Sequence, residues 1–120
     1  MKQIILVSGF TFATFFSFAQ NVVIEENGRV TVRNANDSIT AQIAEIGSGA
    51  IAASFNENKT EIDVVYSNGD VIIKKTDGNT IAQIADADED KAVSASFSGD
   101  NVIIITQSGK TITKNALEWR

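Results

Sequence analysis

The chain repeats itself at an interval of about 40 to 42 residues, and this repetition restricts the possible folds more than any other feature. The segment Ala41–Glu45 (AQIAE) returns as Ala82–Asp86 (AQIAD). The segment Ala50–Phe55 (AIAASF) returns as Ala92–Phe97 (AVSASF). Duplicated supersecondary units bury their apolar faces by stacking on one another, within one chain or between chains. The sequence therefore predicts stacked copies of one small unit.

Residues 1–19 have the composition of a secretory signal peptide. Lys2 gives the positive start, an apolar stretch follows it, and residues 17–19 (SFA) provide the small side chains that a signal peptidase requires. We expect cleavage before Gln20, which leaves residues 20–120 as one β-repeat domain. A retained membrane anchor is the alternative, but the apolar stretch is short for a bilayer span. The sequence therefore predicts an exported protein, secreted or periplasmic, with no membrane insertion after cleavage.

Charge and composition exclude several classes of function. The formal net charge is -5, and an acidic chain is a poor match for a phosphate backbone, so we expect no nucleic-acid binding. The sequence contains no cysteine and no histidine. Disulfides, thiolate or imidazole metal sites, and Ser-His or Cys-His catalytic pairs are therefore impossible. We expect a protein that is not an enzyme.

The segment after residue 19 reads as β-structure along its length, because stretches rich in Val, Ile and Thr alternate with turn residues. The predicted strands are Val22–Glu25, Arg29–Arg33, Ser38–Ala44, Ala50–Phe55, Ile62–Ser67, Asp70–Thr76, Thr80–Ala85, Ala92–Phe97, Asn101–Gln107 and Lys110–Lys114. Two-residue turns are expected at Asn27-Gly28, Asn68-Gly69 and Ser108-Gly109. These connections are too short for parallel crossovers. The predicted fold is all-β, with about two and a half to three four-stranded antiparallel meander repeats.

One part of the repeat resembles a known architecture. Residues 92–106 (AVSASFSGDNVIIIT) read as strand, turn and strand, and residues 108–113 (SGKTIT) read as the next hairpin. This pattern resembles the blades of β-propellers, particularly those of the WD-repeat type, although the Gly-His and Trp-Asp signatures of that family are absent. The resemblance implies a propeller-like packing of sheets around an axis and transfers no site residues. Because single-chain propellers have about four to eight blades, we expect a homo-oligomer or a protein partner.

The acidic stretch at Asp86, Asp88 and Asp90 is the sharpest local feature. Alternating carboxylates can supply oxygen ligands to calcium, so these three residues are candidate metal ligands. However, Lys91 and Phe97 stand where a helix-loop-helix calcium loop needs Gly and Glu. A solvated loop between two repeats is the other interpretation. No other cofactor is expected.

The sequence offers several candidate binding surfaces. A carbohydrate site would use aromatic faces, and the chain offers Tyr66 and Trp119 for that purpose. Phe55 and Phe97 recur at the same strand position, which favours core packing for both. The polar loop 56–61 is a further candidate, because loops on a fixed scaffold diversify binding. We expect an exported, non-enzymatic binding or scaffolding module. A carbohydrate-binding oligomeric lectin and a fibrous or adhesive surface component are the alternatives.

Overall fold

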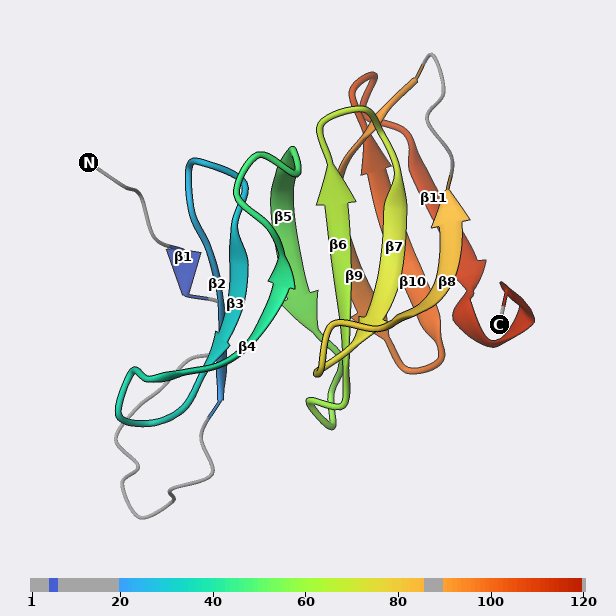
Figure 1. The fold of residues 1–120 in the computed structure, drawn as a ribbon. Helices are drawn as coiled ribbons and strands as arrows, with labels where there is room; N and C mark the ends of the chain where they lie inside the picture. Colours follow the sequence, from blue (N-terminus) through green and yellow to red (C-terminus); the bar gives the residue numbers. More distant parts are fainter. Residues whose placement is uncertain (1–4, 7–19, 86–89, 120) are drawn as a thin grey trace.

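The computed structural model describes residues 5–6, 20–85 and 90–119, and within them the fold is all-β (Figure 1). The elements are β1 Ile5–Leu6, β2 Asn21–Ile24, β3 Val30–Arg33, β4 Ile39–Ala44, β5 Ala50–Phe55, β6 Glu61–Tyr66, β7 Val71–Lys75, β8 Thr80–Ala85, β9 Ala92–Ser98, β10 Asn101–Thr106, β11 Thr111–Asn115 and the 3-10 helix η1 Ala116–Trp119. Consecutive strands pair to form sheet A (β1 to β4), sheet B (β5 to β8) and sheet C (β9 to β11). All strand pairs are antiparallel, so the predicted meander repeats are confirmed at this level.

The ten strands expected from the sequence are present, each with ends within about one residue of the prediction. Strand β1 is an addition, because it lies inside the segment predicted to be a signal peptide. Ile5 pairs with Ile24 and Leu6 pairs with Val23, so β1 occupies the edge of sheet A beside β2. It holds the position that β5 holds in sheet B.

The repeated hairpin turns differ from the prediction in length. In the first copy the N–H of Glu25 donates to the carbonyl of Arg29, and the N–H of Gly28 donates to the carbonyl of Glu25, both at 2.9 Å. The same two bonds recur in the turns that begin at Tyr66 and Thr106. Each loop therefore holds three residues instead of the expected two. In this type of turn only the last loop residue needs a positive φ, which Gly28 supplies with a φ of +90°.

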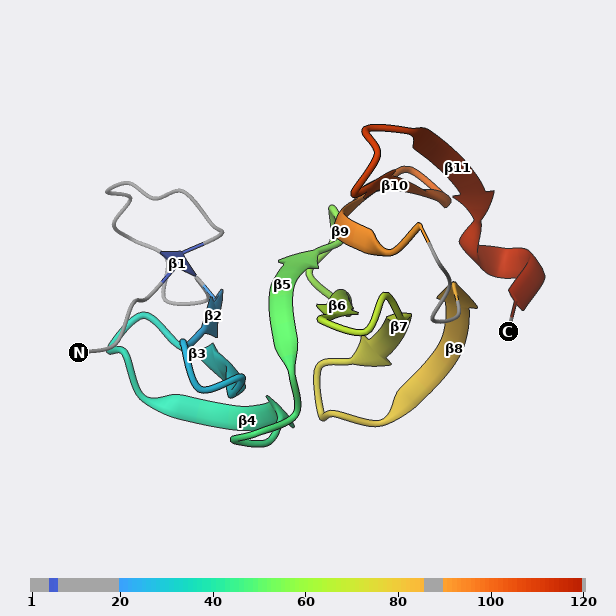
Figure 2. The same cartoon turned by 90° about the horizontal axis from the view of Figure 1, so that it is seen from above.

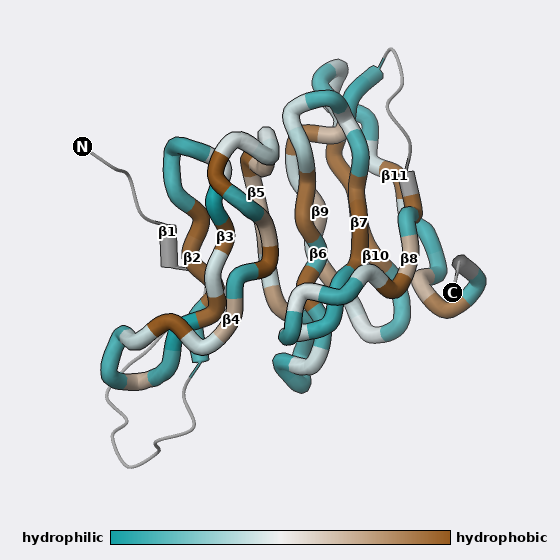
Figure 3. Tube along the Cα trace, viewed as in Figure 1, coloured by the Kyte–Doolittle hydropathy of each residue, from teal (hydrophilic) through white to brown (hydrophobic). Residues whose placement is uncertain are grey.

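The three sheets stack in a row, with sheet B between the other two (Figures 1 and 2). Two apolar layers separate them, and the strands that form these layers are the most hydrophobic parts of the chain (Figure 3). The layer between sheets A and B contains Val22, Ile24, Val30, Val32, Ile43, Ala44, Ala50, Ile62 and Val64. The layer between sheets B and C contains Val65, Val71, Ile73, Ala82, Ile84, Ala92, Val102, Ile104 and Ala116. Within the described residues the row does not close into a ring (Figure 2).

The loops that cross from one sheet to the next are fastened to the hairpin turns. The N–H of Ser67 donates to the carbonyl of Gly49 at 2.7 Å, which fixes the loop between β4 and β5. In the next copy the N–H of Gln107 donates to the carbonyl of Lys91 at 2.9 Å. The same backbone bond therefore recurs between a hairpin turn and the end of each crossover loop.

Gly78, in the turn between β7 and β8, lies against the backbone of sheet A. A Cβ atom at Gly78 would come within 2.9 Å of the carbonyl oxygen of Gln42, and the φ of this glycine is +96°. Gly109 has a φ of +91°, but a Cβ atom on this residue would have no other atom within 4 Å. Both alanine variants carry backbone strain, but only Gly78→Ala adds a backbone clash. We expect Gly78→Ala to lower the free energy of unfolding by about 1–3 kcal/mol more than Gly109→Ala, as measured by urea denaturation. Equal losses would show that sheets A and B do not approach closely here.

Candidate functional site

An open cleft of about 570 Å³ lies between sheets A and B. One wall consists of the end of β4 and the crossover loop that follows it, residues 42–48. The other wall is formed by Tyr66 at the end of β6, Lys74 on β7 and Gly78 in the following turn. The cleft thus lies where the outer strand β4 of sheet A and its following loop face the two central strands of sheet B.

Polar groups from both walls converge on this cleft. The ammonium group of Lys74 donates to the carbonyl of Ile43 at 2.9 Å, and this bond ties the two walls together. Gln42 and Glu45 are exposed, and Tyr66 is half-buried. Within the described part of the chain, the side chains of these three residues form no hydrogen bond. An amide, a carboxylate and a phenol are therefore available to a ligand in the cleft.

A second, smaller cleft of about 220 Å³ lies between sheets B and C. The polar loop 56–61 lines one side, and its shorter copy in the β9–β10 turn lines the other together with η1. The side chain of Asn56 is already used inside its own loop, because its Oδ1 accepts from the N–H groups of Thr60 at 2.8 Å and Glu61 at 3.0 Å. The structure thus brings the predicted loop and its copy together, but it leaves fewer free polar groups than in the larger cleft.

Asp63 is a buried carboxylic acid that the sequence reasoning did not single out. It lies on β6 between two residues of the A–B layer, Ile62 and Val64, so its side chain points to the opposite face, toward sheet C. Its exposed fraction is 0%, and its Oδ1 atom has no hydrogen-bond partner. The hydroxyl of Ser54 donates to Oδ2 at 2.7 Å and lies 3.4 Å from the carbonyl oxygen of Ala95 on sheet C.

Burial dominates the acid-base behaviour of Asp63. Loss of hydration raises the pKa of Asp63 from its ordinary value of 3.8 to about 7, and the hydrogen bond from Ser54 opposes only part of that rise. Strongly shifted carboxyl groups often mark active sites. Asp63 is closed off from solvent and from both clefts, so no substrate can reach it in this conformation.

Of the three candidate calcium ligands, Asp86 and Asp88 lie outside the described residues. The carboxylate of Asp90 accepts from the hydroxyl of Ser108 at 2.8 Å and from the N–H of Ser108 at 3.1 Å. The side-chain hydrogen bond from Ser108 is the main reason why the pKa of Asp90 is lowered. Asp90 therefore fastens the crossover loop to the β10–β11 turn. The calcium site stays a prediction from the sequence.

The aromatic residues divide into core and surface groups. Phe55 and Phe97 are half-buried and pack against the two apolar layers, which confirms the core packing predicted for them. Tyr66 packs against the A–B layer and also lines the larger cleft. The backbone of Trp119 belongs to η1, and its side chain lies outside the described part of the structure.

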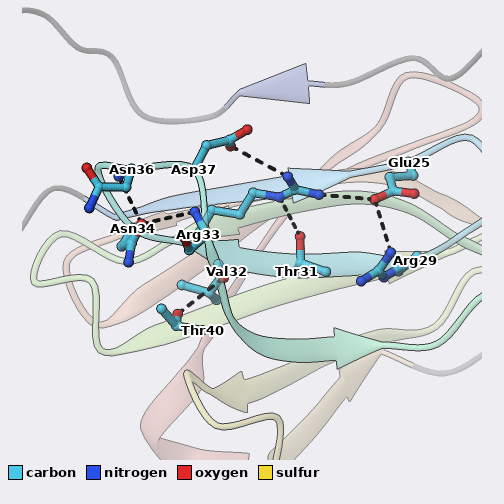
Figure 4. A network of polar contacts seen from close by, with 10 residues as sticks. Glu25, Arg29, Thr31, Val32, Arg33, Asn34, Asn36, Asp37 and Thr40 are labelled. Carbon is cyan, nitrogen blue, oxygen red and sulfur yellow. Dashed lines mark hydrogen bonds and ion pairs between the residues drawn. The ribbon is translucent and has the colours of Figure 1, made fainter.

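A cluster of charged side chains covers the outward face of sheet A (Figure 4). Arg33 lies 3.4 Å from a carboxylate oxygen of Glu25 and 3.5 Å from one of Asp37. Arg29 lies 3.8 Å from the same oxygen of Glu25, and its Nε atom is buried without a partner. Arg33 also donates to the hydroxyl of Thr31 at 3.3 Å. The β2–β3 hairpin and the turn that follows β3 bring these residues together, and the sequence pattern did not predict the cluster.

Comparison with known proteins does not assign this chain to a family. No protein-family model matches the sequence, and a search of curated proteins finds no match. Among the described residues there is also no helix of sufficient length and apolar character to cross a membrane. The function must therefore be argued from the clefts and faces of the molecule itself.

Proposed function

We propose that the chain is an exported, non-enzymatic binding module whose ligand lies in the cleft between sheets A and B. The observation that carries this proposal is the convergence of Gln42, Glu45 and Tyr66 on one cleft of about 570 Å³. That volume suits a small molecule or a short segment of a larger one. The sheet scaffold holds both walls, and the hydrogen bond from Lys74 to the carbonyl of Ile43 links them.

The chemistry of the lining favours an uncharged, hydroxyl-rich ligand such as a short glycan. An amide and a carboxylate form hydrogen bonds with hydroxyl groups, and a phenol ring offers both an apolar face and a polar tip. The lining therefore supports the lectin alternative, in which the ligand of the binding module is a carbohydrate. Hydrolysis is disfavoured, because Asp63, the one carboxyl among the described residues whose pKa is strongly raised, is buried away from the cleft.

The proposed arrangement of the sheets is propeller-like. Sheets A, B and C follow one another with the same strand order and the same junctions, as successive blades do. Export remains part of the proposal on the composition of residues 1–19. A fibrous or adhesive component is less well supported, because the two junctions build a layered globular unit.

The cleft can be tested with a panel of oligosaccharides and short polar peptides, screened by chemical-shift perturbation. We expect the shifts to cluster on residues of the cleft, and the double variant Gln42→Ala, Glu45→Gln to weaken binding about tenfold or more. Gln83 is the control, because it holds the position equivalent to Gln42 in sheet B and does not line the cleft. Gln83→Ala should bind as the parent does. Shifts that map elsewhere, or equal affinity in the double variant, would contradict the proposal.

A further inference from the structure

Asp63 and Ser54 form a polar pair inside the layer between sheets B and C. They are partners in the β5–β6 ladder, and the next partners on the same face, Ala52 and Val65, belong to that apolar layer. At the equivalent position of the other copies the chain has Val22 and Ile103. The repeat itself therefore does not require a carboxyl at this buried position.

The distances around Ser54 fit a chain of hydrogen bonds that a proton on Asp63 completes. The Oγ atom of Ser54 lies 2.7 Å from Oδ2 of Asp63 and 3.4 Å from the carbonyl oxygen of Ala95 on β9. A serine hydroxyl has one proton to donate. When Asp63 is protonated, it can donate to Ser54, which then donates to Ala95 across the junction. When Asp63 is ionised, Ser54 must donate to the carboxylate, and its hydrogen bond to sheet C is lost.

An ionised Asp63 has no counter-charge beside it among the described residues. Strands β5, β9 and β10 contain no titratable side chain. The charged residues that border the junction are Glu61 and Lys75 on sheet B and Asp100, Lys114 and Glu118 on sheet C and η1. None of them shifts the pKa of Asp63, which burial raises and the hydrogen bonds from Ser54 partly lower. In the described structure Oδ1 also has no hydrogen-bond partner, so a closed junction around the carboxylate is costly.

Sheet C can move away from sheet B without breaking a strand ladder. In the described part of the chain, every strand pair lies within one sheet. The junction between sheets A and B is tied more firmly, because Lys74 donates to the carbonyl of Ile43 at 2.9 Å and Lys59 donates to the carbonyl of Gln20 at 3.0 Å. If sheet C moves away, Asp63 stays in its strand between β5 and β7 and becomes hydrated. Opening of the B–C junction is thus a smaller change than unfolding.

We propose that the junction between sheets B and C is a pH-sensitive switch, which is closed when Asp63 is protonated and opens when Asp63 is ionised. The closed form holds the proton more tightly, since burial raises the pKa of Asp63 from 3.8 to about 7. A rise in pH from about 5 to about 7 therefore shifts the equilibrium toward the open form. This switch does not depend on the ligand of the cleft between sheets A and B.

The test measures how readily a thiol reagent reaches each junction. The chain has no cysteine, so a single introduced cysteine reports on one place. Ala92 in the B–C layer and Ala50 in the A–B layer hold equivalent positions and are 5% and 6% exposed, so Ala92→Cys and Ala50→Cys are a matched pair. Each rate of labelling by a dipyridyl disulfide is divided by the rate for the same variant unfolded in urea at the same pH. This division removes the effect of thiol ionisation.

We expect the normalised rate at Ala92→Cys to rise more than about tenfold between about pH 5 and about pH 8, and to exceed the rate at Ala50→Cys at the higher pH. The rise should disappear when Asp63→Asn is added and persist when Asp100→Asn is added, because Asp100 is an exposed carboxylate in the β9–β10 turn. Ala82→Cys, on the sheet B side of the same layer, gives the same measurement if Ala92→Cys fails to fold.

Three results would overturn the proposed switch. The first is a normalised rate at the B–C layer that does not change with pH. The second is an equal rise in the presence of Asp63→Asn. The third is an equal rate at the two layers at every pH, because unfolding of the whole molecule would then expose both of them.

Discussion

Replacing Asp63 with asparagine is expected to stabilise the fold at neutral and alkaline pH and to remove a pH dependence from its unfolding. The folded pKa of Asp63 is about 7, above its ordinary value of 3.8, because the carboxyl is buried. The folded protein therefore holds this proton more tightly than the unfolded chain does. Its contribution to stability is complete below pH 3.8 and is lost as the pH rises to about 7. The difference between the two pKa values corresponds to on the order of 4 kcal/mol.

The measurement is the free energy of unfolding in urea at about pH 5 and about pH 8. We expect the parent protein to be less stable at the higher pH through this group, and Asp63→Asn to show a much smaller difference. Asp100→Asn removes an exposed carboxylate from the β9–β10 turn and should leave the pH dependence of the parent in place. If Asp63→Asn and the parent respond equally to pH, then Asp63 is hydrated or paired in solution.

Two adjacent isoleucines on β10, Ile104 and Ile105, are expected to contribute very differently to the free energy of unfolding when each is replaced by alanine. Ile104 is 1% exposed and packs in the layer between sheets B and C, so Ile104→Ala should cost about 2–5 kcal/mol of unfolding free energy. Ile105 is 41% exposed on the other face, so Ile105→Ala should cost about 1 kcal/mol or less.

These two variants are compared by thermal and urea unfolding at the same protein concentration. Each removes the same atoms from the same strand, so strand propensity is held constant. A cost for Ile105→Ala as large as that for Ile104→Ala would mean that the outward face of sheet C is covered within one molecule. The stacking order of the three sheets would then be wrong.

The positions of the strands could be predicted from the sequence, because the residue types that mark a strand or a turn lie within that segment itself. Runs of β-branched residues define each strand, and the turn glycines Gly28, Gly69 and Gly109 mark where the chain reverses. The length of these turns was predicted wrongly. Asn27 and Asn68 suggested a turn with two positive φ values, whereas the three-residue turn requires only one, at the glycine.

The candidate sites depend on contacts between distant residues, which local patterns do not encode. The larger cleft joins Gln42 to Tyr66 and Lys74, which belong to different sheets. Asp63 did carry a signal, since it interrupts the apolar run of β6 where the third copy has Ile103. Its consequence could not be judged until the structure showed that sheet C covers it.

The meander order of the strands has a consequence for how the chain acquires its structure. Every sheet is made of strands that are consecutive in sequence, so each pairing closes only a short loop. The strand pairs within a sheet can therefore form early, whereas the contacts between sheets join residues that are further apart in the sequence and form more slowly. As synthesis proceeds from the N-terminus, the strands of sheet B can pair before those of sheet C leave the ribosome. The layer around Asp63 is then the last to be sealed.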